Sequence, residues 1–202
     1  EHMVGPIHTR IERVSSNDLE QWSRPEVVLE PTLPWEGHFF RAAGNPCVVR
    51  RDGQYWLYYS AGAVWLKDCG FIEPWNIGVA RSKSLGGPWV KHQQPLIEPS
   101  YSVPHRNHGA GALKVFPDPV SGRLLGFNNG IFIDAEARSR SDIRLLLSDD
   151  GLSWSEAWDR PLVQPEPGWK NALVYALDVH AVGDELWMYY NARDGWAIGQ
   201  ER

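Results

Sequence analysis

The chain has 202 residues, of which 43% are hydrophobic and 22% are charged, and its formal net charge is -5. No apolar run approaches the ~20 residues that cross a bilayer, and no basic cluster is present that could follow a phosphate backbone. These features exclude membrane-spanning proteins and nucleic-acid-binding proteins from the expected classes.

The chain is long enough for one domain, 1–202, with a hydrophobic core of its own. Its first three residues, Glu-His-Met, are interpreted as a vector remnant, and no signal peptide opens the sequence. The localisation is therefore left open, with a preference for the cytoplasm. The two cysteines, Cys47 and Cys69, have the spacing of neither a disulfide framework nor a zinc site.

A sequence element recurs three times, and its copies are IERVSSNDLEQW at 11–22, IGVARSKSLGGPW at 77–89 and IRLLLSDDGLSW at 143–154. The leading isoleucines are separated by 66 residues both times. A short apolar stretch that ends in proline follows each copy. Internal repetition of this length is typical of repeat architectures such as solenoids and propellers.

Hairpin patterns complete each repeat, at 47–61, 113–129 and 178–192. There, β-branched and aromatic residues flank Asp-Gly, Ser-Gly or Gly-Asp turns. Each period thus holds four strands: A and B form the hairpin, C is the repeated element, and D ends in the proline. No segment longer than ten residues has helical spacing. The sequence predicts an all-β protein, a β-propeller of four-stranded blades.

The predicted blades do not make a whole ring. They comprise a half blade, a blade, a second blade and a further half blade, at 11–31, 36–99, 106–165 and 171–202. These are about three blade-equivalents, whereas closed propellers have about four to eight blades. Two explanations stay open: the chain is part of a longer five-bladed protein, or two chains join head to tail in a six-bladed homodimer. We favour the dimer.

The connections between strands fall on two faces, because successive turns of an up-and-down sheet alternate. The A–B and C–D turns are short, and we expect Ser and Asp side chains in the C–D turns to bond local backbone while Trp22, Trp89 and Trp154 wedge between blades. The other face carries the longer B–C loops, predicted at 62–76 and 130–142. We expect it to be the functional face.

Polar side chains with the chemistry of sugar hydrolysis gather in these connections. A pair of carboxylates can protonate the leaving oxygen and attack or activate water. The candidate carboxylates are Asp68, Glu73, Asp134 and Asp178. The candidate substrate-binding residues are Arg41, Asn45, Arg106, His108, Asn129, Tyr175, Arg193 and Trp196. For several of these residues, ordering of the loop itself is an equal alternative.

The blade pattern GNPCVVRRDGQYWLYYSA, followed by IGVARSKSLGGPWV, resembles the five-bladed propeller glycoside hydrolases of families 43, 32, 68 and 117. The resemblance covers nearly the whole chain and is more specific for fold than for substrate. It implies an Asp, a second Asp and a Glu at the starts of the innermost strands. This chain has Asn45, Gly111 or Ala112, and only Asp178 as an acid, so that triad does not carry over.

The leading hypothesis is a glycoside hydrolase-like protein whose partner is carbohydrate. Glu73 would be the general acid, Asp178 or Asp68 the base or nucleophile, and Asp134 a tuning carboxylate. The alternatives are a non-catalytic sugar-binding or scaffold propeller and an inert fragment. No cofactor and no metal site are expected, although a divalent cation in a central channel is compatible with the sequence.

Overall fold

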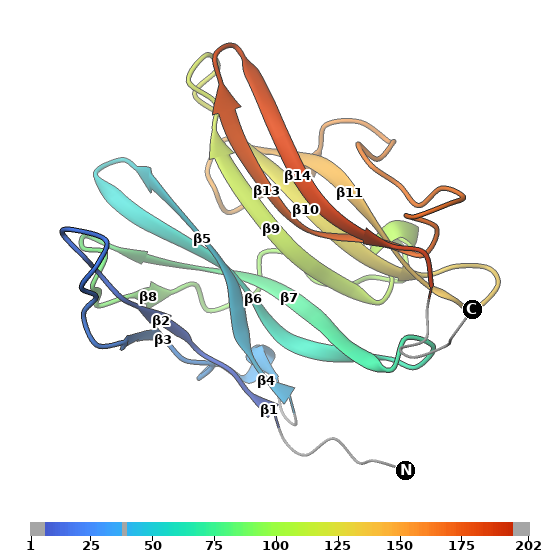
Figure 1. The fold of residues 1–202 in the computed structure, drawn as a ribbon, viewed down its shortest axis with the longest axis horizontal. Helices are drawn as coiled ribbons and strands as arrows, with labels where there is room; N and C mark the ends of the chain where they lie inside the picture. The colour runs from blue at the N-terminus through green and yellow to red at the C-terminus, as the bar shows by residue number, and fades with distance from the viewer. Residues whose placement is uncertain (1–6, 38–39, 196–202) are drawn as a thin grey trace.

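The computed structural model describes residues 7–37 and 40–195, and within them it is built almost wholly of β-strands (Figure 1). Two antiparallel sheets have four strands each. The first contains β5 (Ala43–Arg51), β6 (Gln54–Leu66), β7 (Phe71–Ser82) and β8 (Val90–Lys91) in this order. The second contains β9 (Gly109–Pro117), β10 (Leu124–Ile133), β11 (Ser139–Ser148) and β12 (Ser155–Glu156).

Smaller pairs precede and follow these sheets. β2 (Ile11–Arg13) pairs with β3 (Glu26–Leu29), and β13 (Leu173–Val182) pairs with β14 (Glu185–Arg193). A parallel pair that the repeat did not predict joins β1 (Ile7–His8) to β4 (Phe40–Arg41). The helices of the described residues are single 3-10 turns, η1 (Pro34–Glu36) and η2 (Pro104–Arg106).

Successive sheets pack face to face through buried side chains. One core cluster joins the two full sheets and includes Val49, Trp56, Tyr58, Leu113 and Leu146. A second joins β2–β3 to the first sheet, and a further cluster joins the second sheet to β13–β14. β9 contacts both β5 and β13, so the first strands of successive sheets lie innermost. This arrangement confirms the expectation of propeller blades with four strands.

The turns separate to two ends of the molecule. In Figure 1 the β5–β6 and β13–β14 turns lie towards the upper left, whereas the β6–β7 and β10–β11 turns lie towards the lower right. The lower right end is the one that the sequence predicts to be functional.

The loops predicted at 62–76 and 130–142 are mostly strand, which corrects that expectation. β6 continues to Leu66 and β7 begins at Phe71, so only a tight turn of four residues separates them. β10 and β11 are likewise joined by a short turn, residues 134–138. Long hairpins, not irregular loops, therefore carry the candidate acids Asp68, Glu73 and Asp134.

Strand D is also shorter than expected. β8 and β12 have two residues each, and isolated bridges at Ile97 and Val163 complete the outer edges. Trp154 packs edge-on against Tyr58, as a wedge between blades should, but Trp22 is exposed.

The three innermost strands share an irregularity at equivalent positions. Asn45, Gly111 and Ala176 all have positive φ, of 48°, 65° and 46°, and each lies within a shift of register in its hairpin. At Gly111 only glycine fits, because a Cβ would lie 1.8 Å from the backbone oxygen of Asn129. These bulges bend the innermost strands at the end where the candidate site lies.

Candidate functional site

A pocket of about 150 Å³ lies where the innermost strand of the first blade meets the β6–β7 hairpin. We call it the Glu73 pocket. Its lining includes Asn45 from β5, Ser60 and Gly62 from β6, and Glu73 from β7. The Asn45 amide donates to Ser60 Oγ at 3.2 Å, and Ser60 Oγ donates in turn to the Gly111 carbonyl at 2.8 Å. The pocket wall thus bridges the first and second blades.

Glu73 is the acid of this pocket, and its environment favours the protonated form. Burial of the carboxyl raises the pKa of Glu73 to about 7, and the positive charge of Arg193 acts in the opposite direction. The Arg193 guanidinium lies 5.1 Å from the ring centroid of Phe71. Such a carboxyl holds its proton near neutral pH, which is what a general acid requires.

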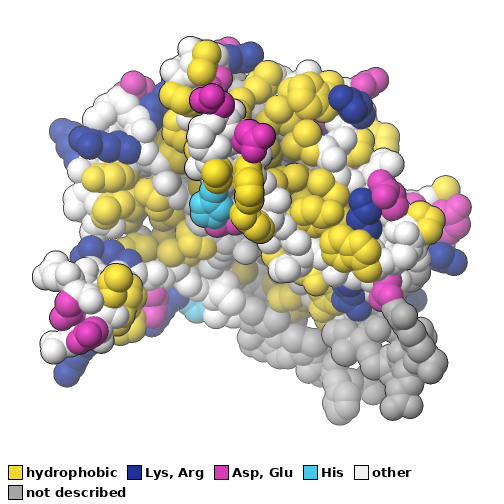
Figure 2. Space-filling view, turned by 45° about the horizontal axis from the view of Figure 1, so that its top comes forward, with side chains coloured by type: hydrophobic (Ala, Val, Ile, Leu, Met, Phe, Trp, Pro, Cys, Tyr) yellow, Lys and Arg dark blue, Asp and Glu magenta, His cyan; other side chains and the backbone are white. Residues whose placement is uncertain are grey.

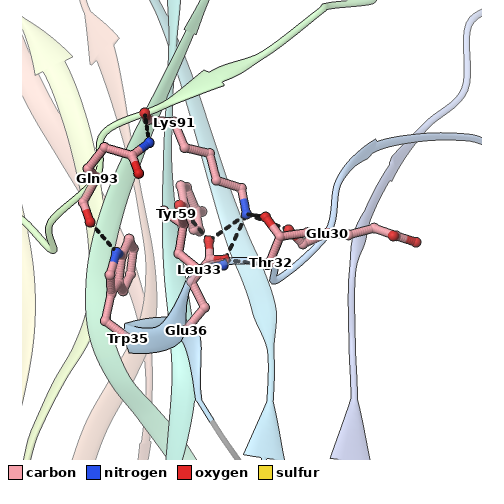
Figure 3. A network of polar contacts seen from close by, with 8 residues as sticks. All are labelled: Glu30, Thr32, Leu33, Trp35, Glu36, Tyr59, Lys91 and Gln93. Carbon is pink, nitrogen blue, oxygen red and sulfur yellow. Dashed lines mark hydrogen bonds and ion pairs between the residues drawn. The ribbon is translucent and has the colours of Figure 1, made fainter.

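A buried ionic network supports the outer wall of the Glu73 pocket (Figure 3). The fully buried Glu36 accepts hydrogen bonds from Lys91 Nζ at 2.7 Å and from the Tyr59 hydroxyl at 2.8 Å. It also accepts hydrogen bonds from the backbone N–H groups of Thr32 and Leu33, just before η1. η1 lies directly behind Gly62, so this network fixes part of the pocket wall. No motif in the sequence indicates the role of Glu36.

Two of the predicted carboxylates fasten the hairpin ends. Asp68 in the β6–β7 turn accepts the backbone N–H of Ser139 at 2.7 Å and the Ser139 hydroxyl, which ties the first blade to the second. Although burial acts to raise it, these hydrogen bonds hold the pKa of Asp68 below its ordinary value. Asp134 accepts from Arg140 Nε at 2.7 Å and from backbone N–H groups of its own turn.

Asp178, the fourth predicted carboxylate, lies on β13 just beyond the bulge at Ala176. It is exposed, and its carboxylate lies 3.2 Å from His180 Nε2. Its charge acts on the Cys47 thiol of the first blade, whose pKa is raised mainly by burial. Asp178 therefore lies on an innermost strand, in a different blade from Glu73.

The predicted substrate-binding residues are distributed over several places. Asn45 lines the Glu73 pocket, Arg193 acts on Glu73, and Tyr175 packs on the same core cluster as Phe71. Asn129 is buried and hydrogen-bonded to the backbone of Val174 and Ala112.

The remaining predicted residues do not line the Glu73 pocket or lie outside the description. Arg41 is exposed on β4, and His108 lies near the β6–β7 hairpin, with Nε2 3.4 Å from the Trp65 carbonyl. Arg106 is half-buried in η2, where burial lowers its pKa. Trp196 lies outside the described residues.

A second, larger cavity of about 920 Å³ opens beside η2 and the second blade. We call it the charged cavity. Arg144 bridges Asp142 and Glu156 at 3.0 and 3.1 Å, and His105 lies 2.7 Å from Glu156. Burial raises the pKa of Asp142 to about 6, opposed by Arg144. The repeat held a signal for this acid, since Asp142 precedes Ile143 as the buried Asn76 precedes Ile77.

Among the described residues, no group of three or more His, Cys, Asp or Glu side chains is arranged to hold a metal ion. Neither 3-10 turn is long and apolar enough to cross a membrane.

Comparison with known proteins agrees with this fold. The family model for glycosyl hydrolases family 43 matches residues 5–108, just over half of the chain. No curated protein matches the chain in sequence. A solved glycoside hydrolase superposes with a TM-score of 0.70 at 15% identity, over 90% of this chain and 56% of its own.

Two further solved structures have the same fold. A family 117 glycoside hydrolase from the marine bacterium Zobellia galactanivorans has a TM-score of 0.62 at 18% identity, over 93% of this chain and 53% of its own. A thermostable family-43 glycoside hydrolase has 0.56 at 21% identity, over 83% and 54%. The chain thus spans about half the length of these structures.

The fold is that of the propeller glycoside hydrolases, in which sheets packed around an axis bring hairpin ends together. Within that class, the chain belongs to glycosyl hydrolase family 43.

Proposed function

We propose that the protein hydrolyses glycosidic bonds and that Glu73 is the general acid. The observation that carries this proposal is a carboxyl in a pocket at the innermost strands whose pKa is raised to about 7 by burial. A carboxyl in that state can give its proton to the leaving oxygen of a glycoside. Family membership supports the reaction class.

Asp178 is the proposed base or nucleophile, in preference to Asp68. Asp178 is exposed, and its charge reaches the first blade at Cys47. The oxygens of Asp68, by contrast, accept hydrogen bonds from Ser139. Asp134 is similarly bound by Arg140, so its proposed part is to hold the β10–β11 turn rather than to tune an acid in the Glu73 pocket.

The proposed substrate contacts follow from the same geometry. Asn45 and Arg193 would bind hydroxyls of the sugar unit beside Glu73, and Tyr175 would support them from the core cluster. Asn129, which is bonded to backbone on both of its amide atoms, would instead maintain the bulge at Gly111.

The test is turnover of a panel of 4-nitrophenyl glycosides of the common pentoses and hexoses. Glu73→Gln should retain binding and lose at least a hundredfold in kcat on the alkyl glycoside of the sugar that the panel selects, the scale of general acid catalysis for a poor leaving group. The wild-type rate should fall as the pH rises through about 7, because the proton of Glu73 is lost. The matched control is Glu20→Gln on the exposed C–D turn, which should leave the rate unchanged. Full activity of Glu73→Gln on that alkyl glycoside would reject the proposal.

A non-catalytic sugar-binding protein is the second candidate. The observation that favours it is that Glu73 is the only carboxylate among the described residues lining the Glu73 pocket. Under this alternative the wild type would bind oligosaccharides without releasing any nitrophenol.

We also propose that two chains join head to tail. Among the described residues β14 pairs only with β13, and β2 only with β3. Hydrophobic side chains are exposed on the face that carries β13–β14, including Leu186, Trp187 and Tyr189 (Figure 2). Pairing of β14 with β2 of a second chain would complete a blade at each junction. A single monomeric species in sedimentation velocity at micromolar concentration would rule this arrangement out.

A further inference from the structure

Three aromatic side chains are exposed beside the Glu73 pocket. Trp65 on β6 and Trp75 on β7 are 42% and 40% exposed, and Tyr101 before η2 is 96% exposed. With Ser100 and His108 they line a groove of about 500 Å³, which we call the aromatic groove. Exposed aromatic side chains of this size, gathered in one groove, are typical of binding surfaces.

The groove is held in shape by its own backbone. Trp65 is paired with Ile72 in the β6–β7 hairpin, so the tryptophans stand on a regular two-stranded ribbon. Trp75 packs over Gly62, whose Cβ position lies 3.5 Å from the indole ring. On the other side, the Ser100 N–H donates to the Arg106 carbonyl at 3.0 Å and closes the loop around η2. Rings held this way lose little conformational entropy when a ligand stacks on them.

The aromatic groove is continuous with its neighbours. Ala63 lines both the aromatic groove and the Glu73 pocket, and Asn107 lines both the aromatic groove and the charged cavity. A ligand with one unit in the Glu73 pocket can therefore extend along the surface into the groove. Among the described residues, no Lys, Arg, Asp or Glu lines the groove, so its surface suits an uncharged unit with an apolar face.

We propose that the aromatic groove binds a second, uncharged sugar unit, so that the ligand of this protein is an oligosaccharide rather than a single sugar. The apolar face of the unit stacks on the groove aromatics, and its hydroxyls bond the Ser100 hydroxyl and the His108 imidazole. This inference rests on the proposed carbohydrate function and assigns Trp65, Trp75 and Tyr101 to substrate length specificity.

The test is calorimetric binding to Glu73→Gln, which keeps the ligand intact, with xylo-, arabino- and galacto-oligosaccharides of one to six units. We expect affinity to rise on going from one unit to two or three. Tyr101→Ala and Trp75→Ala should each lower the affinity for the longer ligands by about tenfold. The affinity for the monosaccharide should stay unchanged. Trp75→Phe should restore part of the loss.

The control is Trp169→Ala, because Trp169 is exposed but stacks on Tyr190 outside the groove. Added to Glu73→Gln, this substitution should leave the affinity for every oligosaccharide of the panel unchanged. Tyr101 is almost wholly exposed, so Tyr101→Ala tests the inference even where Trp75→Ala fails to fold.

Three results would overturn the inference: no saturable binding by any ligand of the panel, affinity independent of length, or unchanged length dependence in Tyr101→Ala. The outcome is separable from that of the proposed catalysis. Length-dependent binding with no turnover in the wild type would reject the hydrolase and keep the groove. Turnover that depends on Glu73 but not on Tyr101 would keep the hydrolase and reject the groove as a binding site.

Discussion

Replacement of Glu73 by Gln should stabilise the protein at alkaline pH and leave its stability unchanged in acid. Burial raises the pKa of Glu73 from an ordinary 4.5 to about 7. The folded state therefore holds the proton more tightly than the unfolded chain. The free energy of unfolding falls as the pH rises from about 4.5 to about 7, and the loss is complete above that range.

The size of the effect follows from the shift. One pKa unit corresponds to about 1.4 kcal/mol, so the ionised Glu73 carboxylate costs at most about 3 kcal/mol. Gln has the same shape and no charge, so Glu73→Gln should exceed the wild type by up to this amount at pH 8 and match it at pH 4.5. In a chain of this length the difference corresponds to roughly 6–12 °C in Tm.

Urea unfolding of both proteins at pH 4.5, 6, 7 and 8 measures the difference directly. Other titrating groups, Asp142 among them, act on both proteins and cancel in the comparison. Glu20→Gln, on the exposed C–D turn, serves as the control and should show no gain that depends on pH. A difference in the free energy of unfolding between Glu73→Gln and the wild type that is the same at all four pH values would refute the raised pKa of Glu73.

Three other substitutions test the supports of the site. Lys91→Met leaves the buried Glu36 carboxylate unpaired and should lower the free energy of unfolding by about 3–5 kcal/mol in urea titrations; a loss under 1 kcal/mol would contradict the network. Asp68→Asn should cost about 1–2 kcal/mol and keep most of kcat, since its bonds go to Ser139; a kcat reduced a hundredfold would make Asp68 the base instead. Gly111→Ala should destabilise by about 2 kcal/mol or more, because its Cβ would meet a backbone carbonyl of the next strand; wild-type stability would show that the bulge is absent.

Much of the fold could be predicted because the isoleucines that recur in the repeat are buried in the structure. Ile77 and Ile143 are buried on the third strand of their four-stranded sheets, and Ile11 is buried on β2 of the leading pair. An interval of 66 residues in the sequence therefore marks equivalent positions in successive units. Strand D was harder to predict. Two-residue strands and single bridges, as at Ile97, leave too few residues for an alternating pattern.

The hairpin at 62–76 was mistaken for a loop for a related reason. Gly62, with φ of 64°, and Pro74 both lie inside long strands, where glycine and proline usually mark breaks. β6 continues past Gly62 and β7 continues past Pro74, because the two strands pair on both sides of these residues.

The site could be predicted in kind but not in detail. Acids and aromatics at the hairpin end indicate sugar chemistry, and Glu73 is partly buried, with its pKa raised by that burial. The partner of Asp68, by contrast, is Ser139, which is 71 residues away. No local pattern reveals whether a carboxylate faces a pocket or another hairpin, and the burial of Glu36 depends on Lys91 and Tyr59 in the same way.

The most direct test of the central claim compares two leaving groups. A general acid is needed for a poor leaving group and hardly at all for an activated one. Glu73→Gln should therefore lose at least a hundredfold in kcat/KM on an alkyl glycoside and far less on the 2,4-dinitrophenyl glycoside of the same sugar. Equal losses on both substrates, or none on either, would contradict the assignment of Glu73 as the proton donor.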